Sequence, residues 1–130
     1  MKNMNPVVHF ELPSDDKKRM IKFYSSAFGW ECNEMGDDMS NYVVVMTDES
    51  DKNGPKEKGR INGGFFQRSK GEVPSVVIGV EDIKEHIEIV KKAGGKVDME
   101  PVEIPGVGLY AHFTDTEGNK LSMLQPTNMK

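Results

Sequence analysis

The side chains best suited to chemistry in this chain are a histidine and a glutamate near its beginning. His9 and Glu11 lie in the alternating segment 7–12. Strand alternation therefore puts both on one face, opposite the apolar face that contains Phe10. An imidazole can hydrogen-bond a ligand or act as a general base near neutral pH, and a carboxylate can orient it. The structural alternatives are a histidine satisfied by Glu11 or a neighbouring strand, and a glutamate exposed at a strand end.

The other candidate side chains are hydroxyls and aromatic rings. Ser75 and Ser122 can donate and accept hydrogen bonds, but no GxSxG motif and no suitably spaced histidine or acid marks either as a nucleophile. Tyr42 and Tyr110 could supply stacking surface, although aromatic residues in strands usually belong to the core. His112 lies in a predicted strand whose orientation the sequence leaves open, so it is a second candidate for a pocket.

The composition fits one soluble domain and argues against several classes of partner. With 130 residues and a net charge of −4, the chain has no basic stripe that would favour nucleic acid or an anionic membrane. The single cysteine, Cys32, excludes an intrachain disulfide and a CxxC motif. Residues 1–6 lack the apolar core of a signal peptide, and no segment is long enough to span a bilayer. We therefore expect a cytoplasmic protein.

Hydrophobic periodicity in the first half predicts a strand, a helix and three further strands. The strand at 7–12 is expected to stop at Pro13, and Ser14 or Asp15 to cap a helix that ends at Gly29. That helix has an apolar stripe formed by Met20, Phe23, Tyr24 and Ala27. Strands are predicted at 30–35, 42–46 and 61–67, with a turn at Gly36-Asp37-Asp38 and a mobile exposed loop at 48–60.

The second half repeats this order of elements. A strand at 75–80 precedes a helix capped by Asp82, with an apolar stripe and a stop at Gly94-Gly95. Three more strands are predicted at 96–102, 108–114 and 120–125. The spacing from Asp16 to Asp82 also relates Gly29 to Gly95, which indicates two copies of a βαβββ module. We expect a single domain, 1–130, with module one at 6–67, a linker at 68–74 and module two at 75–126.

Short motifs in this order resemble one known family. They are Phe23-Tyr24, Phe28-Gly29-Trp30, Val80-Glu81-Asp82-Ile83, Ala93-Gly94-Gly95, Ile104-Pro105-Gly106-Val107-Gly108 and Asp115-Thr116-Glu117-Gly118-Asn119. The pattern is similar to the vicinal oxygen chelate superfamily of glyoxalase I, bleomycin-resistance proteins and extradiol dioxygenases. Together with Asn62-Gly63-Gly64 it looks like a bacterial glyoxalase-like subgroup. The resemblance implies an α+β fold in which two βαβββ modules form a curled eight-stranded mixed sheet, a cup, with the helices outside. It also implies a homodimer.

The resemblance implies four metal-ligand positions on the first and last strands of the modules. Carried over, they are His9, Gly63, Ser75 and Ser122. Only one of these can serve as a good ligand, and a divalent transition-metal site needs about three N, S or carboxylate donors. Even with Glu11 as a second donor, we expect no cofactor and regard a divalent metal as disfavoured.

Three hypotheses follow. The first is a metal-free protein of the bleomycin-resistance type that binds a small molecule in the cup. Its ligand-binding residues would be His9, Glu11, Asn62, Gly63, Ser75, Tyr110 and Ser122. The second is a lyase or isomerase, possibly metal-assisted, with His9 as the catalytic general base. The third is a component or immunity-like partner in a larger pathway, with the cup partly filled by its own side chains.

Overall fold

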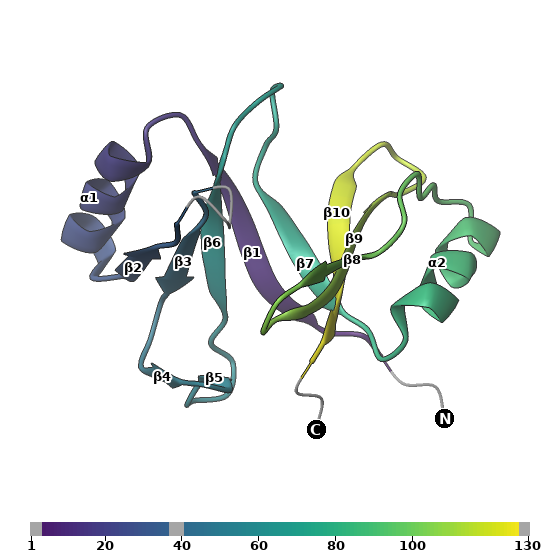
Figure 1. Ribbon diagram of the computed structural model, residues 1–130, viewed down its shortest axis with the longest axis horizontal. Helices are drawn as coiled ribbons and strands as arrows, with labels where there is room; N and C mark the ends of the chain where they lie inside the picture. The colour runs from purple at the N-terminus through teal and green to yellow at the C-terminus, as the bar shows by residue number, and fades with distance from the viewer. Residues whose placement is uncertain (1–3, 37–40, 128–130) are drawn as a thin grey trace. The chain divides into compact units, whose positions relative to one another are not determined.

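The computed structural model describes residues 4–36 and 41–127, so Asp37 and Asp38 of the predicted turn lie outside the described residues. The chain divides into two compact units (Figure 1). We call His9–Pro74 the N-terminal unit, and the segment ending at Val8 together with the chain from Ser75 onward the C-terminal unit. The predicted α+β class, with one helix and four main strands in each module, is confirmed.

The strands of each unit follow the same scheme. In the N-terminal unit the order is β2-β3-β6-β1, and in the C-terminal unit it is β7-β10-β9-β8. In each unit the first and last strands of the predicted module pair in parallel: β1 with β6 and β7 with β10. The other pairs are antiparallel. The bounds are β1 Val7–Ser14, α1 Lys17–Phe28, β2 Glu31–Glu34, β3 Val43–Met46, β6 Asn62–Gln67, β7 Ser75–Gly79, α2 Ile83–Lys92, β8 Val102–Ile104, β9 Gly108–Thr114 and β10 Lys120–Pro126.

Each unit has a hydrophobic core between its helix and one face of its strands. In the N-terminal unit Val43, Val45 and Phe65 are fully buried, and Tyr24 of α1 packs against them. In the C-terminal unit the corresponding cluster consists of Val80, Ile83, Ile87, Ala111 and Met123. Burying such side chains stabilises the fold by roughly 1.5–3 kcal/mol for each large one. The helices therefore occupy one face of the strands, and the side chains of the opposite face are available for a site.

Both helices begin at an aspartate, as the repeat predicted for equivalent positions. Asp16 accepts a hydrogen bond from the Arg19 amide, and Asp82 accepts one from the Glu85 amide, each at 3.1 Å. Asp82 was predicted as a cap, but the prediction of Ser14 or Asp15 for the first helix was wrong because β1 continues to Ser14.

Pro13 does not end the first strand, as we had expected. The Ser14 carbonyl still accepts a hydrogen bond from the Arg68 amide of the neighbouring segment at 3.0 Å. Alternate residues of a strand direct their backbone groups to opposite sides, so the missing N–H of Pro13 faces away from β6 and breaks no bond with it.

The predicted apolar stripe of α1 is only half correct. Met20 and Tyr24 pack on the core, joined by Ile21, whereas Phe23 is 56% exposed and Ala27 is exposed as well. No residue of α1 is fully buried. The helix stops where expected, because Gly29 adopts a left-handed conformation with φ of 73°.

Two further segments differ from the predictions. Residues 48–60 contain a small hairpin, β4 (Ser50–Asp51) and β5 (Gly54–Pro55), in place of a structureless loop. This hairpin is held by polar contacts, such as the hydrogen bond from Asn62 to Ser50, which the pattern of apolar residues does not predict. The segment 96–102 forms only a bridge at Lys96 before β8, because Pro101 lacks the N–H that a continuous strand requires. Among the described residues, no helix has the length and apolar character needed to cross a membrane.

Candidate functional site

The N-terminal unit gathers three polar side chains on the face opposite its core. In the parallel pair of β1 and β6, His9 lies beside Asn62 and Glu11 lies beside Gly64. Tyr42 comes immediately before β3 and lies on this face, because successive side chains alternate between faces and Val43 is buried in the core. Its hydroxyl lies 3.2 Å from Nε2 of His9 and donates to Oε2 of Glu11 at 3.4 Å. We call His9, Glu11 and Tyr42 the N-terminal cluster.

Gly64 makes room for this arrangement. A Cβ built on Gly64 would overlap the ring and hydroxyl of Tyr42, so any side chain at this position would displace the tyrosine. Gly63 has a different role, because its Cβ would overlap the ring of Phe10 on the core face. The two adjacent glycines therefore permit close approaches on opposite faces of the same strand.

Burial and hydrogen bonding both act on His9 in the N-terminal cluster. Burial of the imidazole lowers the pKa of His9, so the ring is neutral at neutral pH. The hydroxyl of Tyr42 donates to Glu11, and in the tautomer of His9 that carries its hydrogen on Nε2 the imidazole donates to the phenolic oxygen. Nδ1 then carries a lone pair, and it has no hydrogen-bond partner among the described residues. This atom can accept a hydrogen bond or a proton from a ligand.

The C-terminal unit has its own cluster on the corresponding face. Ser122 of β10 pairs with Val77 and His112 of the neighbouring strands. Its Oγ lies 2.7 Å from the hydroxyl of Tyr110 and 3.2 Å from Nδ1 of His112. The serine is only 2% exposed, so these contacts replace the hydrogen bonds to water that it loses. We call Tyr110, His112 and Ser122 the C-terminal cluster.

Strand register corrects one predicted correspondence between the modules. The spacing that relates the two helix caps also matches Glu11 with Val77. In the structure Glu11 pairs with Gly64, and Val77 pairs with Ser122. The counterpart of Ser122 is therefore Gly64, and not the adjacent Gly63 that was carried over as the ligand position on the last strand of module one. The prediction was wrong by one residue because it matched Gly59, within the 48–60 segment, with Gly118, and the turns before the two last strands differ in length.

The same reasoning reveals a match that the sequence concealed. Val43 pairs with Phe65, and Ala111 pairs with Met123, in equivalent positions of the two units. The residues just before Val43 and Ala111 are Tyr42 and Tyr110, which are therefore counterparts. The two tyrosines lie slightly further apart in the chain than the two helix caps do, so a search at a fixed period passes over them. Sequence reasoning treated Tyr42 only as stacking surface and missed its central position.

The remaining predicted residues lie apart from the clusters. Ser75 begins β7, at the position that the repeat assigns to His9. Asn62 shares a face with Gly64, but its amide accepts from the Thr47 backbone N–H at 2.9 Å and donates to Ser50 at 3.0 Å. It thereby anchors the small hairpin. The ligand-binding roles of the seven predicted residues stay predictions, and so does the catalytic role of His9 as a base.

The described residues offer few donors for a metal ion. Of the four positions implied by the resemblance, His9 alone supplies a nitrogen ligand once Gly64 replaces Gly63 as the fourth. Within residues 4–36 and 41–127, no three side chains of the types His, Cys, Asp or Glu gather where they could hold an ion. Glu11, the carboxylate closest in the strand to His9, already accepts a hydrogen bond from Tyr42.

Comparison with known proteins decides the family. A family model of the Glyoxalase/Bleomycin resistance protein/Dioxygenase superfamily matches residues 7–123. The chain belongs to this superfamily. The match spans both units and includes at least part of every strand and helix described above, so the resemblance inferred from the short motifs is confirmed.

Two curated relatives within the superfamily are similar in sequence. A probable chloroplastic lactoylglutathione lyase from Arabidopsis thaliana is 31% identical over 109 residues, which make up 78% of this chain but only 30% of that protein. A glyoxylase-like domain-containing protein from Didymella fabae is 29% identical over 119 residues, 84% of each chain. The chain therefore spans less than a third of the length of the first relative.

Several solved structures have the same fold. Methylmalonyl-CoA epimerase from Streptomyces coelicolor, in complex with 2-nitronate-propionyl-CoA, has a TM-score of 0.72 and 13% identity, covering 98% of this chain and 99% of that one. A hypothetical protein from Bacillus halodurans C-125 has a TM-score of 0.70 and 16% identity, with the same coverage. At such low identity these similarities establish the fold alone.

Proposed function

We propose that this superfamily member binds a small organic molecule at the N-terminal cluster, without a metal ion at the four family positions. The observation that supports the proposal is the placement of the Tyr42 hydroxyl between His9 and Glu11, at 3.2 Å and 3.4 Å. The tyrosine engages Nε2 of the only imidazole at these positions, and in the Nε2–H tautomer Nδ1 keeps the lone pair that would accept from a ligand.

The set of donors does not fit a metal ion of the family type. Zn²⁺ and related ions need about three protein ligands, usually imidazole, thiolate or carboxylate. Gly64 has no side chain, and the hydroxyls of Ser75 and Ser122 are poor ligands for these ions. The chemistry of the proposed site therefore rests on hydrogen bonds and proton transfer.

The cluster favours a ligand that donates hydrogen bonds. The neutral Nδ1 of His9 and the carboxylate of Glu11 are both acceptors, so a hydroxyl, amide or amine group of the ligand would bind there. Apolar neighbours on the same face, Val44 and Phe66, would contact the remainder of the molecule. A small, partly apolar molecule with one or two hydroxyl or amide groups matches this surface.

The test is a panel of small hydroxy acids, amides and aromatic alcohols, measured by thermal stabilisation and then by calorimetry. We expect at least one compound class to bind, and Tyr42→Phe or His9→Gln to weaken its affinity about tenfold, as loss of a hydrogen bond worth about 1.4 kcal/mol would. Tyr24→Phe is the matched control, because it removes a hydroxyl from a ring that stacks on Trp30 in the core.

Each outcome of this experiment decides part of the proposal. Ligands whose affinity is the same in wild type, Tyr42→Phe and His9→Gln would place binding elsewhere. No stabilisation by any compound would favour a chain that carries no ligand and acts only through partners. Elemental analysis of the tag-free protein tests the metal separately, because a stoichiometric divalent ion that His9→Ala removes would overturn the metal-free site.

A second function is lyase or isomerase activity with His9 as general base, and it is favoured by the neutral imidazole of His9, which has a ring nitrogen with a lone pair that can take up a proton. The similarity to a protein named as a probable lactoylglutathione lyase points in the same direction. His9→Gln distinguishes the two functions. A binding protein would lose affinity modestly, whereas an acid–base catalyst would lose about two to four orders of magnitude in turnover.

A further inference from the structure

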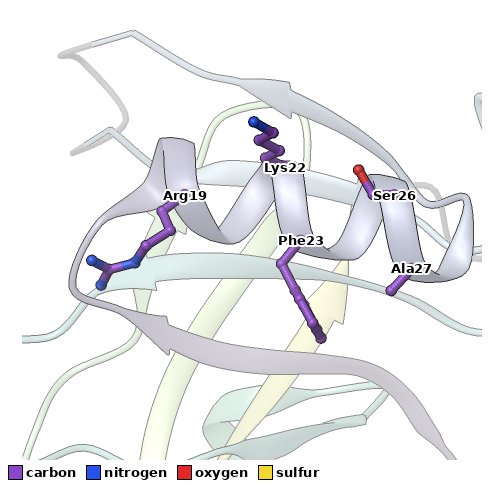
Figure 2. A pocket seen from close by; sticks show the side chains of 5 residues that line it. All are labelled: Arg19, Lys22, Phe23, Ser26 and Ala27. Carbon is purple, nitrogen blue, oxygen red and sulfur yellow. The ribbon is translucent and has the colours of Figure 1, made fainter.

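The outer face of helix α1 contains an open hollow that is unrelated to the N-terminal cluster. Figure 2 shows the side chains that line it, and its volume is ≈ 420 Å³. The lining residues follow one stripe of the helix, turned away from the core: Arg19, Lys22, Phe23, Ser26 and Ala27. Phe23 lies in this stripe with 56% of its surface exposed, which is unusual for a large aromatic side chain.

The charges beside Phe23 are not explained by the stability of the helix itself. Helix α1 has no acidic residue in its first turn, although an acidic side chain there would favour the helix dipole. Arg19 and Lys22 instead place two cations in the first half of the helix. Arg19 lies 3.9 Å from Asp16, and Lys22 has no ion pair among the described residues. This stripe is therefore an exposed aromatic residue flanked by cations.

Helix α2 carries the opposite pattern at the equivalent positions. Because Asp16 and Asp82 cap their helices in the same way, equal steps from these two residues reach equal positions on the two helices. The counterparts of Arg19, Lys22 and Phe23 are then Glu85, Glu88 and Ile89. All three α2 residues are exposed, Ile89 to 45%. At these three positions each helix thus presents an exposed apolar side chain beside two like charges, and the two signs are opposite. Glu88 also lies 3.8 Å from Lys91 of its own helix, and an exposed ion pair of this kind contributes too little to prevent Glu88 from pairing with a cation of another molecule.

We propose that the outer face of α1 docks on the outer face of α2 of a second copy of this chain. When the two helices run parallel, equivalent positions meet, so the cations of α1 lie against the carboxylates of α2 and Phe23 packs beside Ile89. Pairing of α1 with α1, or of α2 with α2, brings like charges together and is disfavoured. Exposed ion pairs contribute little affinity, so the charges select the pairing while the apolar contact stabilises it.

The test uses two charge-reversed variants and sedimentation equilibrium at low salt. Variant one is Arg19→Glu with Lys22→Glu, and variant two is Glu85→Lys with Glu88→Lys. The wild type is expected to self-associate, and each variant to do so at least about tenfold more weakly, because opposite charges become like charges. A mixture of the two variants restores complementary faces and is expected to associate about as well as the wild type.

Matched controls keep the result interpretable. Lys52→Glu with Lys58→Glu makes the same change of net charge as variant one in the 48–60 segment and should leave association unchanged. Circular dichroism of each variant confirms folding, and Phe23→Ala should weaken association without changing net charge. A wild type that stays monomeric at high concentration, self-association that survives both reversals, or variants that fail to associate when mixed would each overturn the proposal.

Discussion

The two units place a tyrosine at the same point of the same strand order, yet the hydroxyls reach different partners. In the N-terminal unit Tyr42 passes over Gly64 and reaches His9 and Glu11. In the C-terminal unit Tyr110 meets Ser122 at 2.7 Å. The counterparts Gly64 and Ser122 differ by one CH₂OH group. The partners of the two tyrosines therefore differ at this position and also where His9 and Glu11 are matched by Ser75 and Val77.

The strongest test of this comparison is Gly64→Ala. The added methyl group overlaps the ring of Tyr42, so we expect the free energy of unfolding to fall by about 1–3 kcal/mol, as in other overpacked sites. Urea unfolding measures the change. In a Tyr42→Ala background the same substitution should cost less than about 1 kcal/mol. Equal costs in both backgrounds would show that the tyrosine does not occupy this space.

Ser122→Ala tests the other half of the comparison. It leaves the hydroxyl of Tyr110 and Nδ1 of His112 without their shared partner, so we expect a loss of about 1–2 kcal/mol in unfolding free energy. The ¹⁵N chemical shifts of the His112 ring should change as well, because Nδ1 loses a hydrogen bond. Unchanged shifts would mean that the serine and histidine do not interact in solution.

The helix caps offer a comparison in which the two units should respond alike. Asp16→Ala and Asp82→Ala each remove a hydrogen bond of 3.1 Å, and each should destabilise the protein by about 1 kcal/mol. Local effects should differ, because α2 retains the buried Ile83 and Ile87 whereas α1 has no fully buried residue. Hydrogen exchange should therefore accelerate more in α1, and the opposite order would mean that α1 is held to its core more firmly than α2.

The smallest expected effect concerns pH. Burial lowers the pKa of His9 below its ordinary value of 6.5, so the unfolded chain binds a proton at a higher pH than the folded one. This contribution to stability is present above pH 6.5 and is lost as the pH falls through the folded-state pKa. Urea unfolding between pH 7.5 and 5 should show a steeper decline in wild type than in His9→Gln. A shallower or equal decline would mean that His9 is protonated as readily in the folded protein.

The sequence predicts the fold well where local signals agree. The alternation in β1, the stripe of Ile83, Ile87 and Val90, and the stop at Gly29 each reflect a local preference that tertiary packing does not oppose. The stripe of α1 was less predictable because Phe23 is apolar but exposed. Periodicity alone cannot separate an apolar residue of the core from one on an outer face.

The candidate site was only partly predictable. Strand alternation correctly placed His9 and Glu11 on one face, but the position of Tyr42 depends on the pairing register of three strands. The number of residues that separates matched positions of the two modules changes between the first helix and Tyr42. It changes again at the 48–60 segment, which lengthens the first module, so no single spacing relates all matched residues. The hairpin within that segment is held by Asn62 and by the pair of Asp48 with Arg60, contacts with no signature in hydrophobic pattern.

The overlap between Tyr42 and Gly64 also makes these two positions epistatic. A histidine or glutamate at position 64 would displace the tyrosine ring that lies above it, whichever ion the new side chain binds. Whether Tyr42 moves aside or is replaced, its hydroxyl leaves the position that it shares with His9 and Glu11. A metal ligand at position 64 and the present N-terminal cluster are therefore alternatives, and a change toward one is a change away from the other.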